Sequence, residues 1–307
     1  MASAEGICDC LVIGGGPAGL TAAIYLARFH LAVIVIDAGQ SRASLIPLTR
    51  NHAGFPEGIT GPDLLARMRS QAGLFGAELR NGHVDALERR QGDFLARTDQ
   101  STIRARTVLL ATGVVNRRPP MIDDSTHARA VAAGRLRYCP ICDGYEVTDR
   151  AVAVLGTGER GCNEALFLRS YTANVTLIAP EAARQLSAQQ RALLGEAGIG
   201  IAGPCRAIRL DGNEILVDLE AGPRAFDSLY PALGSDARSE LAGQVGADLS
   251  EEGCLKVDAH QRTSVEGLYA AGDVVLGLDQ ISHAMGEGGV AATTIRNDLA
   301  RQTPLLR

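Results

Sequence analysis

Short runs of apolar residues alternate along the chain with segments of helical spacing and with glycine-rich turns. The first example is CLVIGGGPAGLTAAIYLARFHLAVIVIDAG at residues 10–39. An apolar run, glycines, an amphipathic segment and a second apolar run follow one another there, which predicts strand, turn, helix and strand. The second strand ends at Asp37. This order of elements is typical of the first half of a nucleotide-binding α/β unit.

Three glycines in the predicted turn, Gly14, Gly16 and Gly19, form a G-x-G-x-x-G motif. The first permits the tight turn, the second lets the backbone approach a pyrophosphate, and the third lets the helix pack on the strand. The phosphates would lie at the helix N-terminus, where free N–H groups and the helix dipole favour negative charge. Asp37 follows Gly14 by 23 residues, which suits a ribose hydroxyl. A glycine turn alone can serve packing, so the inference of dinucleotide binding depends on the whole combination.

The same pattern recurs in AVAVLGTGERGCNEALFLRSYTANVTLIAP, from Ala151. Gly156, Gly158 and Gly161 repeat the motif, each 142 residues after its counterpart. The match continues without a gap into the strand VTLIA. Two copies in one chain are far more specific than one, and they predict two dinucleotide-binding units.

The C-terminal stretch is predicted to complete the first unit. Residues 265–300 read as a strand, Gly272-Asp273 and a long helix, and TVLLATG at 107–113 reads as a buried strand that ends in a small-residue turn. We therefore expect an α/β fold with two Rossmann-like, three-layer ββα domains, the second inserted into the first. The expected boundaries are 1–116 with 236–307 for the first domain and 117–235 for the second, with linkers near NRRPP at 116–120 and near 232–240.

Composition limits the classes of function. Apolar residues make up 46%, charged residues 21%, and the net charge is −5, which argues against nucleic acid or an anionic membrane as the main partner. No stretch approaches the roughly 20 apolar residues of a membrane span, and no basic leader precedes the first apolar run. The seven cysteines are odd in number and mostly isolated. We therefore expect a protein of the reducing cytoplasm.

Two of these cysteines, Cys139 and Cys142, stand in YCPICDGYEV. The pair is compatible with a disulfide staple, half of a zinc site or a redox centre. Zinc needs four ligands, and the sequence has one CxxC. Cys8 and Cys10 are expected on one face of the first strand, and nothing pairs them with this segment. A staple is unusual in a cytoplasmic protein, which favours the redox centre.

With these motifs in order, the chain resembles the low-molecular-weight thioredoxin reductases and their relatives among the FAD-dependent pyridine nucleotide-disulfide oxidoreductases. The likeness rests on IGGGPAG, ATG at 111–113, CPICDG, GTGERG and AAGDV, and it covers nearly the whole length. It implies FAD in the discontinuous domain, a nicotinamide-nucleotide domain inserted into it, and a redox-active CxxC on the insert. It also implies a homodimer that reduces a thioredoxin-like protein or a small disulfide.

The resemblance assigns cofactor-binding residues by position. For FAD, the first glycine motif would hold the pyrophosphate, Asp37 the adenosine ribose, and Asp273 the ribityl or pyrophosphate region. Gln280, opening the last helix, and Asn51 resemble residues beside the flavin ring, although Asn51 alone reads equally well as an Asx-turn residue. The full expected set is Gly14, Gly16, Gly19, Asp37, Asn51, Thr112, Gly113, Gly272, Asp273, Gln280 and Ile281 for FAD, with Gly156, Gly158 and Gly161 for NAD(P).

The resemblance also assigns the redox roles. Cys142 would face the flavin and react with it as a thiolate, and Cys139 would be the sulfur that leaves when the disulfide opens. Thiolates carry this chemistry, so a group must hold or release the proton, and Asp143 is the adjacent candidate for general acid and base. His283, close after Gln280, is a further candidate base near the flavin. A helix histidine that bonds to backbone is an equally good interpretation of His283.

The sequence departs from the family where NADPH would bind. A His-Arg-Arg cluster usually follows the strand of the second unit, but here Ala179, Pro180 and Glu181 take its place, and Glu181 would repel a 2′-phosphate. Arg184 is near enough in sequence to reach a phosphate. Asp279 stands where the family usually has arginine.

These departures leave the electron donor open. NADPH or NADH is possible but weakly supported, and a relative that takes electrons from a ferredoxin-type donor, or runs as a dithiol oxidase with oxygen, is the alternative. A flavin-binding redox sensor without turnover is a third hypothesis.

Overall fold

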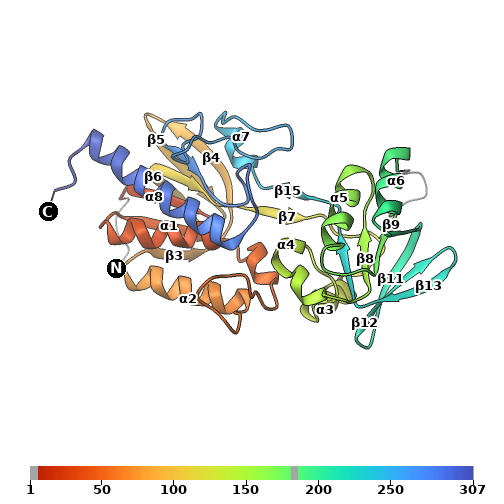
Figure 1. The fold of residues 1–307 in the computed structure, drawn as a ribbon. Coiled ribbons are helices and arrows are strands. Elements are labelled where there is room, and N and C mark those ends of the chain that lie inside the picture. Colours follow the sequence, from red (N-terminus) through yellow and green to blue (C-terminus); the bar gives the residue numbers. More distant parts are fainter. Residues whose placement is uncertain (1–5, 181–185, 307) are drawn as a thin grey trace. The chain divides into compact units, whose positions relative to one another are not determined.

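The computed structural model describes residues 6–180 and 186–306, and these residues form two compact units (Figure 1). Of these residues, 6–44, 60–115 and 236–306 form the first unit, and 45–59, 116–180 and 186–235 form the second. Leu45–Ile59 thus packs with the inserted unit, although the expected boundaries place it in the first domain. Both units are Rossmann-like and α/β, as the sequence predicts.

The first unit has a sheet with the strand order β3-β2-β1-β6-β5-β4, and β16 pairs with β6. The pairs among β3, β2, β1, β6 and β16 are parallel, whereas β4, β5 and β6 form an antiparallel meander. Its strands are β1 (Cys8–Ile13), β2 (Val33–Asp37), β3 (Glu78–Asn81), β4 (Val84–Arg90), β5 (Asp93–Thr98), β6 (Thr102–Leu110) and β16 (Leu268–Ala270). Its helices are α1 (Pro17–Arg28), η1 (Arg42–Leu45), α2 (Gly61–Leu74), α7 (Glu240–Gln244) and α8 (Ile281–Gln302).

Two apolar cores make this unit three layers deep. Alanines of α1 and α8 pack with Val12 and Leu109 on one face of the parallel sheet, where the two helices lie side by side (Figure 1). Leu87, Phe94 and Leu241, from the meander and α7, pack on the other face. The layers are therefore helices, parallel sheet and meander.

Small residues bring the two helices of the first core together. A Cβ atom at Gly288 of α8 would overlap the carbonyl oxygen of Ala18 in α1, so only glycine permits this approach. The close contact holds the C-terminal helix against α1, which begins at the first glycine turn.

The two cysteines of β1 lie in different cores, so the expectation that they share one face was wrong. Cys8 packs with the meander and Cys10 with the helices, and burial raises the pKa of each thiol to about 12. The N–H groups of Asp9 and Cys10 both donate to the carbonyl of Ala32, which breaks the alternation at this point. Both cysteines are buried free thiols.

The second unit combines a parallel sheet, β10-β9-β8-β14, with an antiparallel sheet, β11-β12-β13. The parallel strands are β8 (Val152–Leu155), β9 (Val175–Ile178), β10 (Gly200–Ala202) and β14 (Ser228–Pro231). The antiparallel strands are β11 (Cys205–Asp211), β12 (Glu214–Leu219) and β13 (Gly222–Phe226). The helices are α3 (Asp124–Ala132), α4 (Pro140–Asp143), η2 (Gly144–Val147), α5 (Gly158–Leu168) and α6 (Ala188–Glu196).

Two short strands connect the units, and they pair with each other. β7 (Val114–Asn116) leads into the insert and β15 (Ser235–Ala237) leads out of it. Arg238 N donates to Gly113 O at 3.0 Å at one end of this ribbon, and Arg117 N donates to Gly234 O at 2.9 Å at the other.

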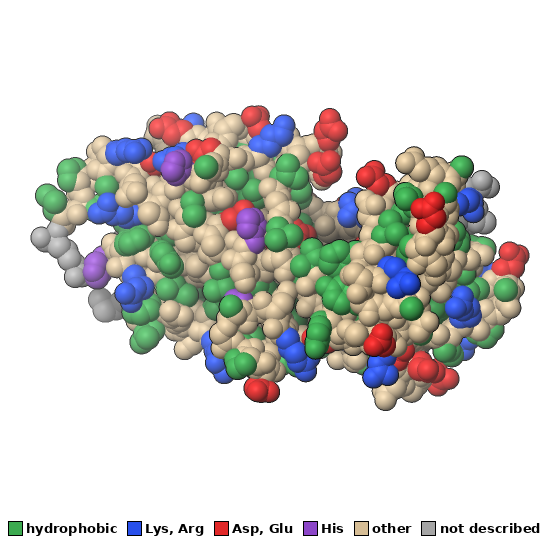
Figure 2. Space-filling model, viewed as in Figure 1, with side chains coloured by type: hydrophobic (Ala, Val, Ile, Leu, Met, Phe, Trp, Pro, Cys, Tyr) green, Lys and Arg blue, Asp and Glu red, His purple; other side chains and the backbone are tan. Residues whose placement is uncertain are grey.

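Figure 2 shows acidic and basic side chains interspersed over the face in view. Among the helices of residues 6–180 and 186–306, none is both long and apolar enough to span a bilayer.

Candidate active site

The first glycine turn is shaped to receive a phosphate. Gly14 has φ +113°, and a Cβ there would overlap the carbonyl oxygen of Ala111, while a Cβ at Gly19 would overlap that of Gly14. These two glycines serve close packing. Gly16 is the N-cap of α1, makes no side-chain cap, and leaves the first-turn N–H groups of a 12-residue helix without an acidic neighbour in that turn. This arrangement fits the pyrophosphate of FAD.

Asp37 ends β2 beside this turn. Its carboxylate is buried, accepts a hydrogen bond of 3.0 Å from Gly39 N, and pairs with Arg69 of α2. A Cβ at Gly15 would overlap the same carboxylate. Asp37 is therefore held in a fixed orientation beside the glycine turn, and its contact with a ribose hydroxyl stays a prediction. Arg69, which fixes its orientation, belongs to no sequence motif, so the sequence pattern does not predict this contact.

Asp273 and Asp279 share one arginine. Arg42 of η1 places its Nη1 atom 2.8 Å from Oδ2 of Asp279 and 3.3 Å from Oδ2 of Asp273. Burial raises the pKa of Asp273, Asp279 raises it further, and Arg42 opposes both. The cation that the family usually carries at 279 is thus supplied here by a residue from the other end of the chain.

The last helix begins where the sequence predicts. Gln280 is the N-cap of α8 and Ile281 is its first residue. His283 Nε2 lies 3.0 Å from Oε1 of Glu287, so its partner is a carboxylate one turn later. Glu287 is buried, and its Oε2 accepts a 2.7 Å hydrogen bond from Gly272 N. His283 is therefore tied to the Gly272 turn through Glu287, while its role as a base stays a prediction.

The ATG segment lies at the C-terminal end of β6. Thr112 donates from Oγ1 to the carbonyl of Arg238 at 2.6 Å. Gly113 has φ +67°, and a Cβ there would meet open space. Both residues shape the turn after the strand, at the edge where the glycine turn also lies.

The redox pair lies on the inserted unit. Cys139 and Cys142 form a disulfide, with Cα atoms 5.2 Å apart, and Cys139 is the N-cap of α4. Both are partly exposed. Since each sulfur is bonded to the other, neither is a thiolate ligand here, and no group of three His, Cys, Asp or Glu in the described residues is placed to hold a metal ion.

Asp143 directly follows the pair and is held from two sides. Arg137 Nη1 donates to its Oδ2 at 2.8 Å, and the Tyr230 hydroxyl donates to its Oδ1 at 2.8 Å. Burial raises the pKa of Asp143, and Arg137 and Tyr230 oppose the shift. The carboxyl is therefore poised to hold a proton beside the disulfide.

Asn51 contacts this redox helix. Its Oδ1 accepts a 2.8 Å hydrogen bond from Thr49, and its Nδ2 lies 3.5 Å from the carbonyl oxygen of Ile141. The local bond to Thr49 is of the turn-stabilising kind. The contact with Ile141 joins the segment Leu45–Ile59 to α4, and a place beside the flavin ring stays a prediction.

The second glycine turn is intact, but its surroundings differ from the first. Gly156 and Gly161 pack against each other, and Gly158, with φ +61°, opens α5. After β9, Ala179 uses its N–H and carbonyl to bond Ala202 and Cys205, and Pro180 is buried. Glu181 and Arg184 lie outside the described residues. The described part of this edge thus offers neither a basic clamp nor an acid equivalent to Asp37.

One acid of this unit, Glu164, is half-buried and has no counterpart among the predicted site residues. Burial raises the pKa of Glu164, on α5, to about 7, and Arg160 opposes the shift. Its Oε1 atom is buried and has no hydrogen-bond partner among the described residues. Glu164 follows a glycine motif in sequence, but only the three-dimensional packing reveals its burial.

Several known proteins are similar to this chain in sequence and in fold. Residues 8–288 match the family described as "Pyridine nucleotide-disulphide oxidoreductase". A thioredoxin reductase of Streptomyces coelicolor is 34% identical over 283 residues, which cover 87% of this chain and 86% of that protein. The NADPH-dependent thioredoxin reductase 3 of Arabidopsis thaliana is 31% identical over 320 residues, which cover 97% of this chain and 59% of the plant protein. The crystal structure of thioredoxin reductase from Streptococcus pyogenes matches with a TM-score of 0.88 and 25% identity, covering 97% of this chain and 100% of that one.

Proposed function

Because the chain belongs to the pyridine nucleotide-disulphide oxidoreductase family, we propose that it reduces the disulfide of a thioredoxin-like protein through Cys139 and Cys142. It is an FAD-dependent disulfide oxidoreductase and resembles thioredoxin reductases in sequence and fold. The observation that carries the proposal is a partly exposed disulfide next to a half-buried carboxyl, Asp143.

FAD, when bound, carries two electrons between the donor and the disulfide. The residues that would hold it are those of the first unit. The N–H groups at the start of α1 would bind the pyrophosphate, Asp37 the adenosine ribose, and Asp273 the ribityl region. Gln280 and Ile281, at the N-terminus of the 22-residue helix α8, would direct its N–H groups and dipole toward negative charge on the ring.

The thiol chemistry follows from the pair and its neighbour. Reduction of the Cys139–Cys142 disulfide takes up two electrons and two protons and gives two thiols. One of them, as a thiolate, attacks the external disulfide to form a mixed disulfide, and the other cysteine then resolves it, releasing the partner as a dithiol. Asp143 gives and takes the proton in these exchanges, with Arg137 and Tyr230 fixing its two oxygens.

A protein partner suits the surface around the pair. Ile141, between the two cysteines, is 51% exposed, and Tyr145 is 80% exposed. Exposed apolar side chains beside a reactive disulfide favour a partner that covers them over a small disulfide that would leave them in water. A homodimer in the cytoplasm is part of the same proposal, carried by the resemblance.

For the electron donor we propose NADPH, used weakly. The intact turn at Gly156, Gly158 and Gly161 supports a pyrophosphate, but Ala179 and the buried Pro180 replace the basic clamp. That same replacement favours a ferredoxin-type donor as the second candidate.

The experiment tests the electron donor and the disulfide acceptor in separate arms. FAD-loaded enzyme is mixed anaerobically with NADPH or, in a parallel arm, with dithionite, and new thiols on oxidised thioredoxin are counted. We expect thiols from the wild type in the dithionite arm, none from Cys142→Ser, and a normal yield from Cys254→Ser, which changes a cysteine outside the pair. Full turnover by Cys142→Ser would refute the assignment of the redox pair.

A further inference from the structure

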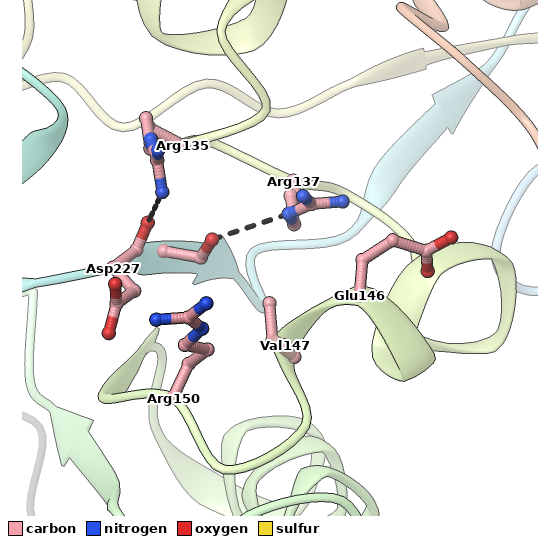
Figure 3. Close-up of a pocket in the computed structure, with 7 residues that line it drawn as sticks. Arg135, Arg137, Glu146, Val147, Arg150 and Asp227 are labelled. Carbon is pink, nitrogen blue, oxygen red and sulfur yellow. Dashed lines mark hydrogen bonds between the residues drawn. The ribbon is translucent and has the colours of Figure 1, made fainter.

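A pocket of about 180 Å³ lies in the inserted unit (Figure 3). The segment between α3 and α4, the end of η2 and the start of β14 form its wall. Its lining residues are Arg135, Arg137, Glu146, Val147, Arg150, Asp227 and Ser228. Five of these seven carry a charge, and three of the five are arginines. The volume suits a small ion rather than a nucleotide.

The two acids of the pocket are already engaged. Glu146 lies 3.4 Å from Nη1 of Arg50. Asp227 accepts a 2.9 Å hydrogen bond from Ala151 N through Oδ2. Glu146 therefore shares its charge with a cation outside the lining, whereas Asp227 keeps its full negative charge beside the arginines.

The arginines are less completely satisfied. Arg135 donates from Nη1 to the carbonyl oxygen of Asp227 at 3.1 Å, a neutral acceptor, and its Nε is buried without a hydrogen-bond partner in the described part of the chain. A buried guanidinium N–H without an acceptor is costly. Arg150 directs its guanidinium into the pocket between Asp227 and Val147 (Figure 3).

Arg137 connects the pocket with the redox centre. Its Nε lies 3.3 Å from Oγ of Ser228 in the pocket wall, while its Nη1 donates to Asp143. One guanidinium therefore lines the pocket and holds the carboxyl that follows Cys142.

We propose that this pocket binds a phosphate group, free or at the end of a small monoester, and that the bound anion competes with Asp143 for Arg137. Arg135 and Arg150 provide hydrogen-bond donors in geometries that match phosphate oxygens. The three arginines of the lining outnumber its two carboxylates, so the pocket has a net positive charge of one that favours an anion. The first part is independent of the proposed function, and the second rests on it.

Competition for Arg137 is expected to favour the protonated form of Asp143. The titratable groups around Asp143 are the cation Arg137, the acid Glu146 and the neutral hydroxyl of Tyr230. Drawing Arg137 toward a bound anion weakens the main cation that favours the carboxylate, and the anion adds negative charge nearby. The protonated form of Asp143 then persists to higher pH.

Binding is tested by titrating inorganic phosphate into FAD-loaded enzyme in a calorimeter, with sodium chloride at matched ionic strength as the blank. We expect a saturable isotherm for the wild type and for Arg206→Gln, which removes an exposed arginine of the same unit. Arg150→Gln and Arg135→Gln should each bind roughly ten- to a hundredfold more weakly, as expected for one charge-assisted hydrogen bond. A glycerol 3-phosphate arm separates the sources: binding of both probes indicates a terminal phosphate group, and binding of phosphate alone indicates the free ion.

Two outcomes would overturn the site: no saturable heat beyond the chloride blank, or equal affinity in all four proteins. The coupling is tested by reducing Cys139–Cys142 with dithiothreitol over a pH series, with and without phosphate. We expect phosphate to move the profile to higher pH in the wild type and to leave it in place in Arg150→Gln. A profile that does not respond in the wild type refutes the coupling, whatever the calorimetry shows.

Discussion

Nη1 of Arg42 donates a 2.8 Å hydrogen bond to Asp279, 237 residues later in the chain. The same atom lies 3.3 Å from Asp273, so one guanidinium separates two carboxylates where FAD is expected to bind. The family usually has an arginine at position 279, whereas this chain has an acid there. The positive charge at this place comes instead from Arg42 of η1.

Replacing Arg42 by Met should weaken FAD binding. The two aspartates would then face each other and the anionic pyrophosphate without a cation, which costs about 1–2 kcal/mol for partly exposed groups and lowers FAD affinity roughly five- to thirtyfold. Fluorescence of released FAD during dilution or urea titration measures this. The double variant Arg42→Met, Asp279→Asn should recover part of the loss, and an unchanged affinity in the single variant would contradict the role of Arg42.

Tyr230→Phe should shift the pH dependence of dithiol–disulfide exchange. The hydroxyl of Tyr230 stabilises the carboxylate of Asp143, so its removal raises the pKa of Asp143 further. The acidic limb of the rate profile should therefore move to higher pH. Tyr269→Phe is the matched control, because its hydroxyl also donates to an aspartate, Asp298, in the other unit. Parallel shifts in both variants would show a general effect on the fold.

Glu164 should make the protein less stable as the pH rises. Its folded-state pKa of about 7 exceeds the unfolded value of 4.5, so the folded state binds more protons between these values and stability falls as the pH rises through them. The loss should be roughly 1–3 kcal/mol in the wild type and absent in Glu164→Gln. Unfolding midpoints across a pH series measure it, with Glu159→Gln, an exposed acid of the same helix, as control. Identical slopes in wild type and Glu164→Gln would disprove the assignment.

Restoring basic residues after β9 should improve the use of NADPH. Pro180→Arg with Glu181→Arg replaces a buried ring and an acid by two cations, and one charge-assisted contact to the 2′-phosphate is worth about ten- to a hundredfold in affinity. The KM for NADPH should fall by this factor while that for NADH, which lacks the phosphate, stays constant. If both constants are unchanged, the missing clamp is not what limits the donor.

The local features of this molecule can be predicted from the sequence. The turns at Gly14 and Gly156, the start of α8 at Ile281 and the CxxC are set by residues close together in the chain, where spacing carries the information. The partners of Asp37 and Asp143, by contrast, are Arg69 and Arg137, single arginines among many scattered ones. Which arginine contacts each aspartate depends on tertiary packing, and no repeating sequence pattern marks those arginines.

The error at Cys8 and Cys10 has a similar origin. Alternation along a strand holds only while the ladder is regular, and two successive N–H groups that share the carbonyl of Ala32 interrupt it. The strand sequence CDCLVI contains no residue that predicts this irregularity.

The ribbon of β7 and β15 bears on how such enzymes are assembled in evolution. Gly113 and Arg238, where the chain leaves and re-enters the first unit, are joined by a hydrogen bond. Arg117 and Gly234, at the two ends of the insert, are joined in the same way. A gene segment that encodes residues 117–234 is therefore a cassette with adjacent ends, which recombination can exchange between relatives without reopening either core. Leu45–Ile59, which packs with the insert but is encoded outside it, is the part that an exchange would have to match.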